Sequence, residues 1–179
     1  MATVFSHAVA GLALSVLARA PAVQARLGIA AVFCSIVPDI DVLGIWLGIR
    51  WGHVLGHRGI THSLAFAAVL AAAVVAVAFH GRARGQRLGF WLALFAATAS
   101  HGVLDAMTDG GLGVAFFAPF DRTRYFLPWR PIPVSPIGVS QFFGERGLAI
   151  MRVEVVLIWV PSVLLLVATI ALRWCRRRA

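Results

Sequence analysis

Residues 62–79, HSLAFAAVLAAAVVAVAF, decide the fold class of this 179-residue chain. From Leu64 to Phe79 the stretch contains only Ala, Val, Leu and Phe, and an apolar run of about 18 residues is long enough to span a membrane as a helix. The whole chain follows the same trend. It is 60% hydrophobic and 13% charged, whereas soluble domains average about 45–50% and about 25%. We therefore expect an integral membrane protein, and neither a disordered chain nor a water-soluble globule.

Four further apolar runs accompany this stretch, so the sequence predicts an all-α, polytopic membrane bundle of about five transmembrane helices in a single domain, 1–179. The predicted helices cover residues 3–18, 27–49, 62–79, 88–108 and 153–172. No positive charge precedes the first run and Pro21 follows it, which favours a retained helix over a signal peptide. Residues 109–152 are rich in Pro and aromatic side chains, and we expect them to form an outer loop on the membrane surface or a re-entrant segment.

The 16 basic residues are all arginine and lie between the apolar runs, which indicates membrane orientation more than binding of nucleic acid. Arginine is denser in segments 19–27, 80–87 and 173–179 than in segments 50–61 and 109–152. By the positive-inside rule, the first three segments are cytoplasmic. The predicted topology has the N-terminus outside and the C-terminus in the cytoplasm.

Charged and imidazole side chains inside these apolar runs are the strongest functional signal. A charge at the centre of a spanning helix costs roughly 2.5–3.5 kcal/mol on insertion scales. His101 and Asp105 are four residues apart and share one helix face. Asp39 and Asp41 directly follow Pro38, which is expected to bend or break the second helix. A bound metal ion is the strongest candidate to offset the cost of burying these groups.

The predicted topology brings the candidate ligands to the outer end of four helices, at similar depth. The metal candidates are His7, Asp39, Asp41, His62, His101 and Asp105. His57 is expected in the loop before the third helix and His62 in its first turn. Each residue also has a structural interpretation: a helix-surface hydrogen bond for His101 and Asp105, a loop cap for the Asp pair, and a buried or interfacial histidine for the others. Which of Asp39 and Asp41 is the ligand is left open.

With these residues in place, the chain resembles the YdjM-type family of inner-membrane, metal-dependent hydrolases. The matching elements are His7, Pro38-Asp39-Ile40-Asp41, His57-Arg58-Gly59-Ile60-Thr61-His62-Ser63, His101-Gly102-Val103-Leu104-Asp105 and Phe117-Ala118-Pro119-Phe120. The resemblance covers residues 1–140 and implies location in the inner (cytoplasmic) membrane. That family is distantly similar to zinc-dependent phospholipase C and related single-strand nucleases. Those enzymes carry further ligands after their HxxxD, and here no His follows Asp105, so one or two ions are expected.

The leading hypothesis is a metal-dependent hydrolase of a phosphoester, such as a phospholipid or lipid-linked phosphate, with zinc as the first candidate ion. The residues expected to take part in catalysis are Asp39, Asp41, His57 and Asp105. Arg58, Arg122 and Arg124 are candidates to bind a phosphate; their alternative is to extend toward lipid headgroups. The rival hypothesis is a non-enzymatic divalent-metal carrier or sensor, which would use the same ligands. A third is a structural bundle that His–Asp contacts lock without any metal. The bilayer is the expected partner, and the sequence does not fix an oligomeric state.

Overall fold

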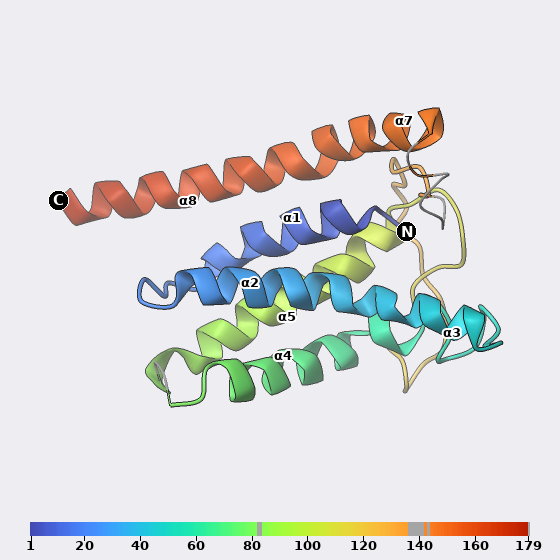
Figure 1. The fold of residues 1–179 in the computed structure, drawn as a ribbon, viewed down its shortest axis with the longest axis horizontal. Helices are drawn as coiled ribbons and strands as arrows, with labels where there is room; N and C mark the ends of the chain where they lie inside the picture. The colour runs from blue at the N-terminus through green and yellow to red at the C-terminus, as the bar shows by residue number, and fades with distance from the viewer. Residues whose placement is uncertain (82–83, 136–141, 143, 179) are drawn as a thin grey trace.

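The computed structural model describes residues 1–81, 84–135, 142 and 144–178, and over these residues the regular structure is helical, with two isolated β-bridges. Four helices form the body of the molecule: α1 (Val4–Leu14), α2 (Gln24–Ile36), α4 (Leu64–Ala78) and α5 (Arg87–Ala106). A long C-terminal helix lies along the outside, and the two termini are at opposite ends of the molecule (Figure 1). The predicted all-helical fold is thereby confirmed for the described residues.

Three helices in the described part of the chain are long and apolar enough to cross a membrane: Gln24–Trp46, Arg87–Ala106 and Glu145–Arg176. Val4–Leu17 and Leu64–Ala78 are apolar but shorter. The five predicted apolar runs therefore all become helical.

Local sequence explains where the helices begin and bend. The Thr3 and Ser63 side chains cap α1 and α4 by accepting the backbone N–H groups of Ser6 and Phe66. After α2, Pro38 falls in a 3-10 turn, Val37–Val42, which leads into the short α3 (Leu43–Trp46). The predicted interruption at Pro38 is therefore present.

The last helix begins earlier than predicted. It runs as α7 (Glu145–Glu154), a π-helical turn (Val155–Trp159) and α8 (Val160–Arg178). Residues 145–152, which we expected in the loop, are therefore helical. This stretch contains the charged residues Glu145, Arg146 and Arg152. It nevertheless forms α7, which extends the apolar helix toward the N-terminus. Within the predicted loop, Pro136 and Phe143 lie outside the described residues, as does Arg82 of the orientation argument.

Small side chains allow the helices to approach closely in the body of the bundle. The buried core away from the loops consists of apolar residues, chiefly from α2, α4 and α5: Leu27, Ala30, Ala31, Cys34, Ala71, Val75, Phe79, Phe90, Ala93, Leu94 and Ala97. A Cβ at Gly11 would collide with the Ser35 Oγ, so α1 and α2 can cross here only because residue 11 is glycine.

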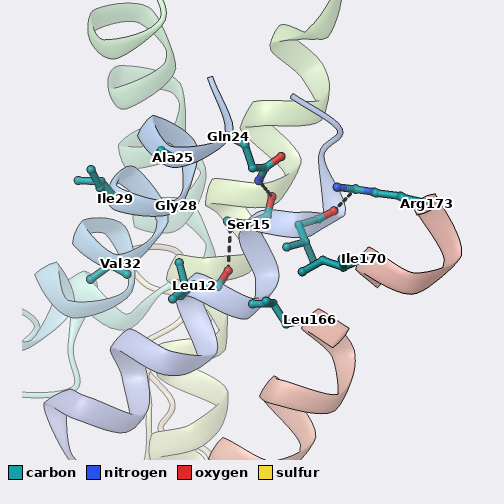
Figure 2. Close-up of a pocket in the computed structure, with 11 residues that line it drawn as sticks. Leu12, Ser15, Gln24, Ala25, Gly28, Ile29, Val32, Leu166, Ile170 and Arg173 are labelled. Atoms are coloured by element: carbon teal, nitrogen blue, oxygen red, sulfur yellow. Dashed lines mark hydrogen bonds between the residues drawn. The ribbon is translucent and has the colours of Figure 1, made fainter. Parts of the chain in front are cut away.

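Helix α8 packs loosely, leaving a groove of about 480 Å³ between it and the ends of α1 and α2. Leu12, Gly28, Ile29, Leu166 and Ile170 make this groove largely apolar (Figure 2). Its polar contacts are few: Gln24 donates to the Ser15 carbonyl, and the Arg173 guanidinium to the Val16 carbonyl. Most of the helix surface is exposed, as expected for a helix that faces lipid.

Residues 107–135 fold back over the other end of the bundle. Backbone N–H groups of Leu127, Ala115 and Asp109 donate to the carbonyls of Ala106, Arg58 and Ile132, respectively. The segment thus packs against the end of α5 and the loop before α4. This is the end where α1 and α4 begin and where α2 and α5 finish (Figure 1).

Candidate metal centre

Four side chains from three parts of the chain meet at this end of the bundle. Asp39 comes from the 3-10 turn after α2, His62 from the 3-10 turn Ile60–His62 before α4, and His101 and Asp105 from one face of α5. One ligand atom of each lies within 4.8 Å of the others, the spacing of a site that could hold a metal ion. His62 therefore precedes α4, where the sequence placed it in the first helical turn.

The imidazoles of His62 and His101 face each other through their Nε2 atoms, which are 3.1 Å apart. His101 Nδ1 lies 2.7 Å from the Ser35 carbonyl, which can only accept, so His101 carries its proton on Nδ1. Thr61 Oγ1 donates to Asp41 and so accepts from His62 Nδ1 at 3.0 Å. Both Nδ1 atoms are donors, and a neutral pair would point two lone pairs at each other.

A cation between the two Nε2 atoms removes this conflict. Two nitrogens bound to one Zn²⁺ at about 2.0–2.1 Å in tetrahedral geometry stand roughly 3.3 Å apart, close to the spacing found here. A single proton shared between the rings would also satisfy the pair. The two cations compete for one position.

Buried atoms without hydrogen bonds and a net negative charge both favour a bound cation. Among the described residues, five buried side-chain nitrogen and oxygen atoms have no hydrogen-bond partner, and all five belong to His7, Asp39 and Asp105. One of them, Asp105 Oδ2, still forms an ion pair with Arg58 Nε at 3.0 Å. Buried polar atoms are rarely left in this state unless something else occupies the site. Asp39, Asp41 and Asp105 bring three negative charges, and the buried Arg58 brings one positive charge. The N-terminal ammonium also acts on Asp105 and Asp39, and the three carboxylates still leave these groups with a net negative charge that attracts a cation. The donor set of imidazole nitrogens and carboxylate oxygens suits zinc, and manganese less closely.

Asp41 lies behind the cluster and holds the ligands in place. Its Oδ1 is 2.8 Å from His57 Nδ1, and its Oδ2 accepts from the Arg58 backbone N–H at 3.1 Å and the Thr61 hydroxyl at 2.6 Å. The same Oδ2 lies 3.1 Å from His62 Nδ1. In contrast, neither carboxylate oxygen of Asp39 has a hydrogen-bond partner, and Asp39 Oδ1 lies 3.3 Å from His101 Nε2. Of the two aspartates, Asp39 is the better placed for the four-residue cluster. Asp41 could ligate an ion only in a second group with His57 and His62.

The neighbouring carboxylates favour a positive charge on the His62 ring, which lies in the 3-10 turn before α4 and so outside the apolar helices. Burial alone would lower the pKa of His62, but Asp105 and Asp41 outweigh burial and raise the pKa to about 9. Without a metal ion, His62 is therefore protonated at neutral pH, and its Nε2–H can donate to His101.

Arg58 is fully buried inside the site, in a left-handed backbone conformation with φ of 61°. Its Nε lies 3.0 Å from Asp105 Oδ2, and its other nitrogens donate to the Gly110 and Leu112 carbonyls and to the Thr108 hydroxyl. Arg58, which the sequence made a candidate to bind phosphate, thus uses its guanidinium for contacts within the protein.

The other two predicted phosphate-binding arginines lie apart from the cluster. Arg124 donates to five backbone carbonyls of residues 51–58 and 113, including those of Trp51, His53 and His57. It thereby fixes the loop that carries His57 and Arg58. Arg122 is exposed on the surface of the same segment.

His7 enters the site from α1. Its ring stacks on His101 with centroids 3.6 Å apart, and its Nε2 lies 3.5 Å from Asp105 Oδ1. The ring is fully buried, and both nitrogens are without hydrogen-bond partners. The structure therefore brings His7 against the cluster but does not include it among the four closest ligand atoms.

The sequence analysis missed one buried acid, Glu154, and two groups that orient ligands. Glu154 lies inside an apolar run that we interpreted only as a spanning helix, although the cost of burying a charge applied to it as well. The orienting groups are the Ser35 carbonyl and the Thr61 hydroxyl. No sequence pattern marks a backbone carbonyl as a partner. Thr61, in contrast, lies inside the motif that carries both His57 and His62.

Comparison with known proteins gives two matches that span nearly the whole chain. The sequence profile of the family described as YdjM inner membrane protein matches residues 1–176. The chain is 36% identical over 181 residues to inner membrane protein YbcI of Escherichia coli (strain K12), which covers 99% of this chain and 100% of that protein. No solved structure matches the chain.

Proposed function

This chain belongs to the YdjM inner membrane protein family, and on that premise we propose that it is a membrane-embedded, metal-dependent hydrolase. We propose a phosphoester substrate, such as a phospholipid or lipid-linked phosphate. The observation that carries the proposal is the cluster of Asp39, His62, His101 and Asp105, with its unpaired buried atoms at one end of the bundle.

Access to the cluster is limited to one corner. The side chains of His62, His101 and Asp105 are fully buried, whereas that of Asp39 is 12% exposed. Both carboxylate oxygens of Asp39 are themselves buried, so we propose that a substrate group or water molecule enters beside Asp39 when the surrounding side chains move. A catalytic site needs such an open position, and a purely structural metal site does not.

A divalent ion in this cluster would supply a water molecule acidic enough to ionise near neutral pH and would polarise a phosphoryl group. The chain's own residues hold and move protons around it. His57 donates its Nδ1 proton to Asp41, which leaves Nε2 able to accept a proton. The two oxygens of Asp105 face different imidazoles: Oδ2 lies 3.6 Å from His62 Nε2, and Oδ1 lies 3.5 Å from His7 Nε2. One carboxylate could therefore serve two neighbouring ion positions. Asp39 is the least buried carboxylate of the cluster and can accept a proton.

The surroundings of the site favour a substrate that comes from the membrane. Large aromatic side chains are exposed at this end of the molecule: Trp46 at 81%, Phe120 at 90% and Trp129 at 61%. Aromatic residues of this kind gather at the membrane–water interface. Arg122 and Arg130 are exposed on the same segment and are available to a phosphate or to lipid headgroups.

We also propose that all five apolar helical segments cross the inner membrane, with the N-terminus outside and the C-terminus in the cytoplasm. The arginines of segments 19–27 and 173–178 lie at the end of the bundle opposite the cluster (Figure 1). If that end is cytoplasmic, the site faces the outer compartment.

The second candidate function is a divalent-metal carrier or sensor that uses the same ligands. A carrier needs polar groups that reach both faces of the membrane. Behind the cluster, the core of α2, α4 and α5 is apolar, with Leu94, Ala97 and Phe90 fully buried. This favours a one-sided site over a pathway.

Metal content of detergent-purified protein, measured by elemental mass spectrometry, tests the site. We expect one or two transition-metal equivalents in the wild type and none in His62→Ala, Asp105→Ala or the His101→Ala/Asp105→Ala double variant. His80→Ala, at the other end of the molecule, is the matched control. A double variant that is folded and keeps the wild-type metal content would overturn the site.

Turnover separates the two functions. The metal-loaded protein in phospholipid vesicles should release a phosphate-containing product, and a chelator or Asp105→Ala should abolish the release. Zn²⁺ uptake into sealed vesicles without any product would overturn the hydrolase and support the carrier.

A further inference from the structure

Glu154 is a fully buried carboxylate outside the metal cluster, on the C-terminal helix. Its Oε1 accepts the Thr3 backbone N–H at 2.8 Å, and its Oε2 accepts the hydroxyls of Thr3 and Ser6, the latter at 2.5 Å. All three donors come from the beginning of α1. A buried charge on a lipid-facing helix is costly, so its contacts must hold this carboxylate firmly.

The π-helical turn Val155–Trp159 directs two side chains to the same place. Trp159 Nε1 donates to Ser6 Oγ at 2.9 Å, and Ser6 in turn donates to Glu154. Residues five apart on an α-helix point about 140° away from each other, given 3.6 residues per turn. The wider turn, with i→i+5 hydrogen bonds, places Glu154 and Trp159 on one face. The last helix thus contacts the first turn of α1 through two side chains, Glu154 and Trp159.

The first turn of α1 also leads directly into the metal cluster. The Ala2 backbone N–H donates to Asp105 Oδ1 at 2.9 Å, and the next N–H, of Thr3, donates to Glu154. Ser6, which binds Glu154, precedes His7. One turn of backbone therefore joins Glu154 to two residues of the site.

His7 differs from the other three imidazoles of the site in having no acceptor of its own. His101 is oriented by the Ser35 carbonyl, His57 by Asp41, and His62 by Thr61 and Asp41. The Nδ1 of His7 has no hydrogen-bond partner, and its Nε2 comes only within 3.5 Å of Asp105 Oδ1. Metal-binding imidazoles nearly always have such a partner on the second nitrogen. The position of His7 is therefore set by its helix and by stacking on His101.

We propose that Glu154 is a positioning residue of the metal centre, which holds the first turn of α1 so that His7 acts as a further ligand. The inference rests on the proposed metal site and adds a fifth ligand to it. Glu154 takes the place of the orienting acceptor that His7 lacks, and it acts through Ser6 and Thr3.

Co²⁺ binding tests this role, because the absorption spectrum of bound Co²⁺ reports the number and type of its ligands. We would titrate purified wild type, Glu154→Gln, His7→Ala and the double variant with Co²⁺. Glu145→Gln, an exposed acid at the start of α7, is the matched control. Loss of an outer-shell partner typically costs about 10–100-fold in metal affinity. We expect Glu154→Gln to bind Co²⁺ at least about tenfold more weakly, with the same spectral change as His7→Ala.

The double variant makes the test specific. If Glu154 acts through His7, removing both should weaken binding no more than removing His7 alone. If Glu154→Gln does not fold, Ser6→Ala, which removes one neutral contact, should show the same spectral change at smaller amplitude.

The outcomes separate this inference from the proposed function. A wild-type protein that binds no Co²⁺ overturns the metal site itself. A wild type that binds Co²⁺, together with a folded Glu154→Gln variant that matches it in affinity and spectrum, overturns only the positioning role. Additive losses in the double variant would also overturn it.

Discussion

The Nε2 atoms of His62 and His101 are 3.1 Å apart, and each ring is fixed by an acceptor on its Nδ1 side. The geometry of this pair of imidazoles favours a positive charge between the rings. A proton supplies that charge in the metal-free protein, and a metal ion would replace the proton. The two states should differ in their response to pH.

Metal-free protein should lose stability as pH rises toward 9. The pKa of His62 is raised from an ordinary value of 6.5 to about 9 in the folded state. A raised pKa adds stability that is fully present below 6.5 and is lost as pH passes through about 9. Thermal unfolding in detergent with a chelator present should therefore show a lower Tm at pH 9 than at pH 6. An unchanged Tm across this range would contradict the protonated state of His62.

Metal affinity should change in the opposite direction. Because the ion displaces the His62 proton, the apparent affinity for Zn²⁺ should rise about tenfold per pH unit from pH 6.5 toward 9. Competition titrations with a chromophoric chelator would measure it. The His62→Ala variant has no such proton to release, so any residual binding should show a smaller slope.

Asp39 and Asp41 should respond differently to the same change. Asp39→Asn replaces an unpaired ligand oxygen and should abolish or nearly abolish metal binding. Asp41→Asn keeps the four-residue cluster but removes an acceptor for His57 and Thr61, which should cost about 10–100-fold in metal affinity. Zn²⁺ titration of both variants checks the order. Greater damage from Asp41→Asn would indicate that Asp41 is a direct ligand in the group with His57 and His62.

Arg124 should matter for stability, and Arg122 should not. Arg124 donates to five carbonyls and holds the loop before α4, so Arg124→Ala should cost on the order of 2 kcal/mol. Arg122→Ala, two residues away and exposed, is the control and should change stability little. Denaturation in detergent measures both. If Arg122→Ala alone impaired phosphoester turnover while stability stayed normal, Arg122 would be the arginine that contacts substrate.

The orientation of the site can be tested with C-terminal reporters. A reporter that works only in the cytoplasm should be active when fused after residue 178 in a bacterial inner membrane, and one that works only in the periplasm should be inactive. The opposite pattern would place the N-terminus and the metal cluster on the cytoplasmic side.

The sequence indicated which residues meet because it shows both helix direction and side-chain spacing. Alternating helices bring the end of α2, the start of α4 and the end of α5 together, and the four-residue spacing of His101 and Asp105 puts both on one face. What it could not show was the division of roles. Asp39 and Asp41 are two residues apart on a tight 3-10 turn, so their directions depend on backbone angles that no periodicity predicts.

Arg58 and Glu154 show a second limit of the sequence. The sequence made Arg58 a candidate to bind a phosphate, but the structure places this left-handed residue with its guanidinium against Asp105. Glu154 looked like the edge of a hydrophobic run, and only the packing of α7 against the start of α1 gives it partners. In both cases the decisive contacts join residues about 50 or about 150 positions apart.

The apolar core beneath the cluster limits the side from which a metal ion could reach it. Leu94, Ala97 and Phe90 close the bundle on that side, and Asp39 is the least buried of the four clustered side chains, so the proposed ion would enter beside Asp39. On the proposed topology, the protein would exchange metal with the pool of a single compartment. Starving or flooding the other compartment with metal would leave the occupancy of the site unchanged, except through transporters that link the two pools.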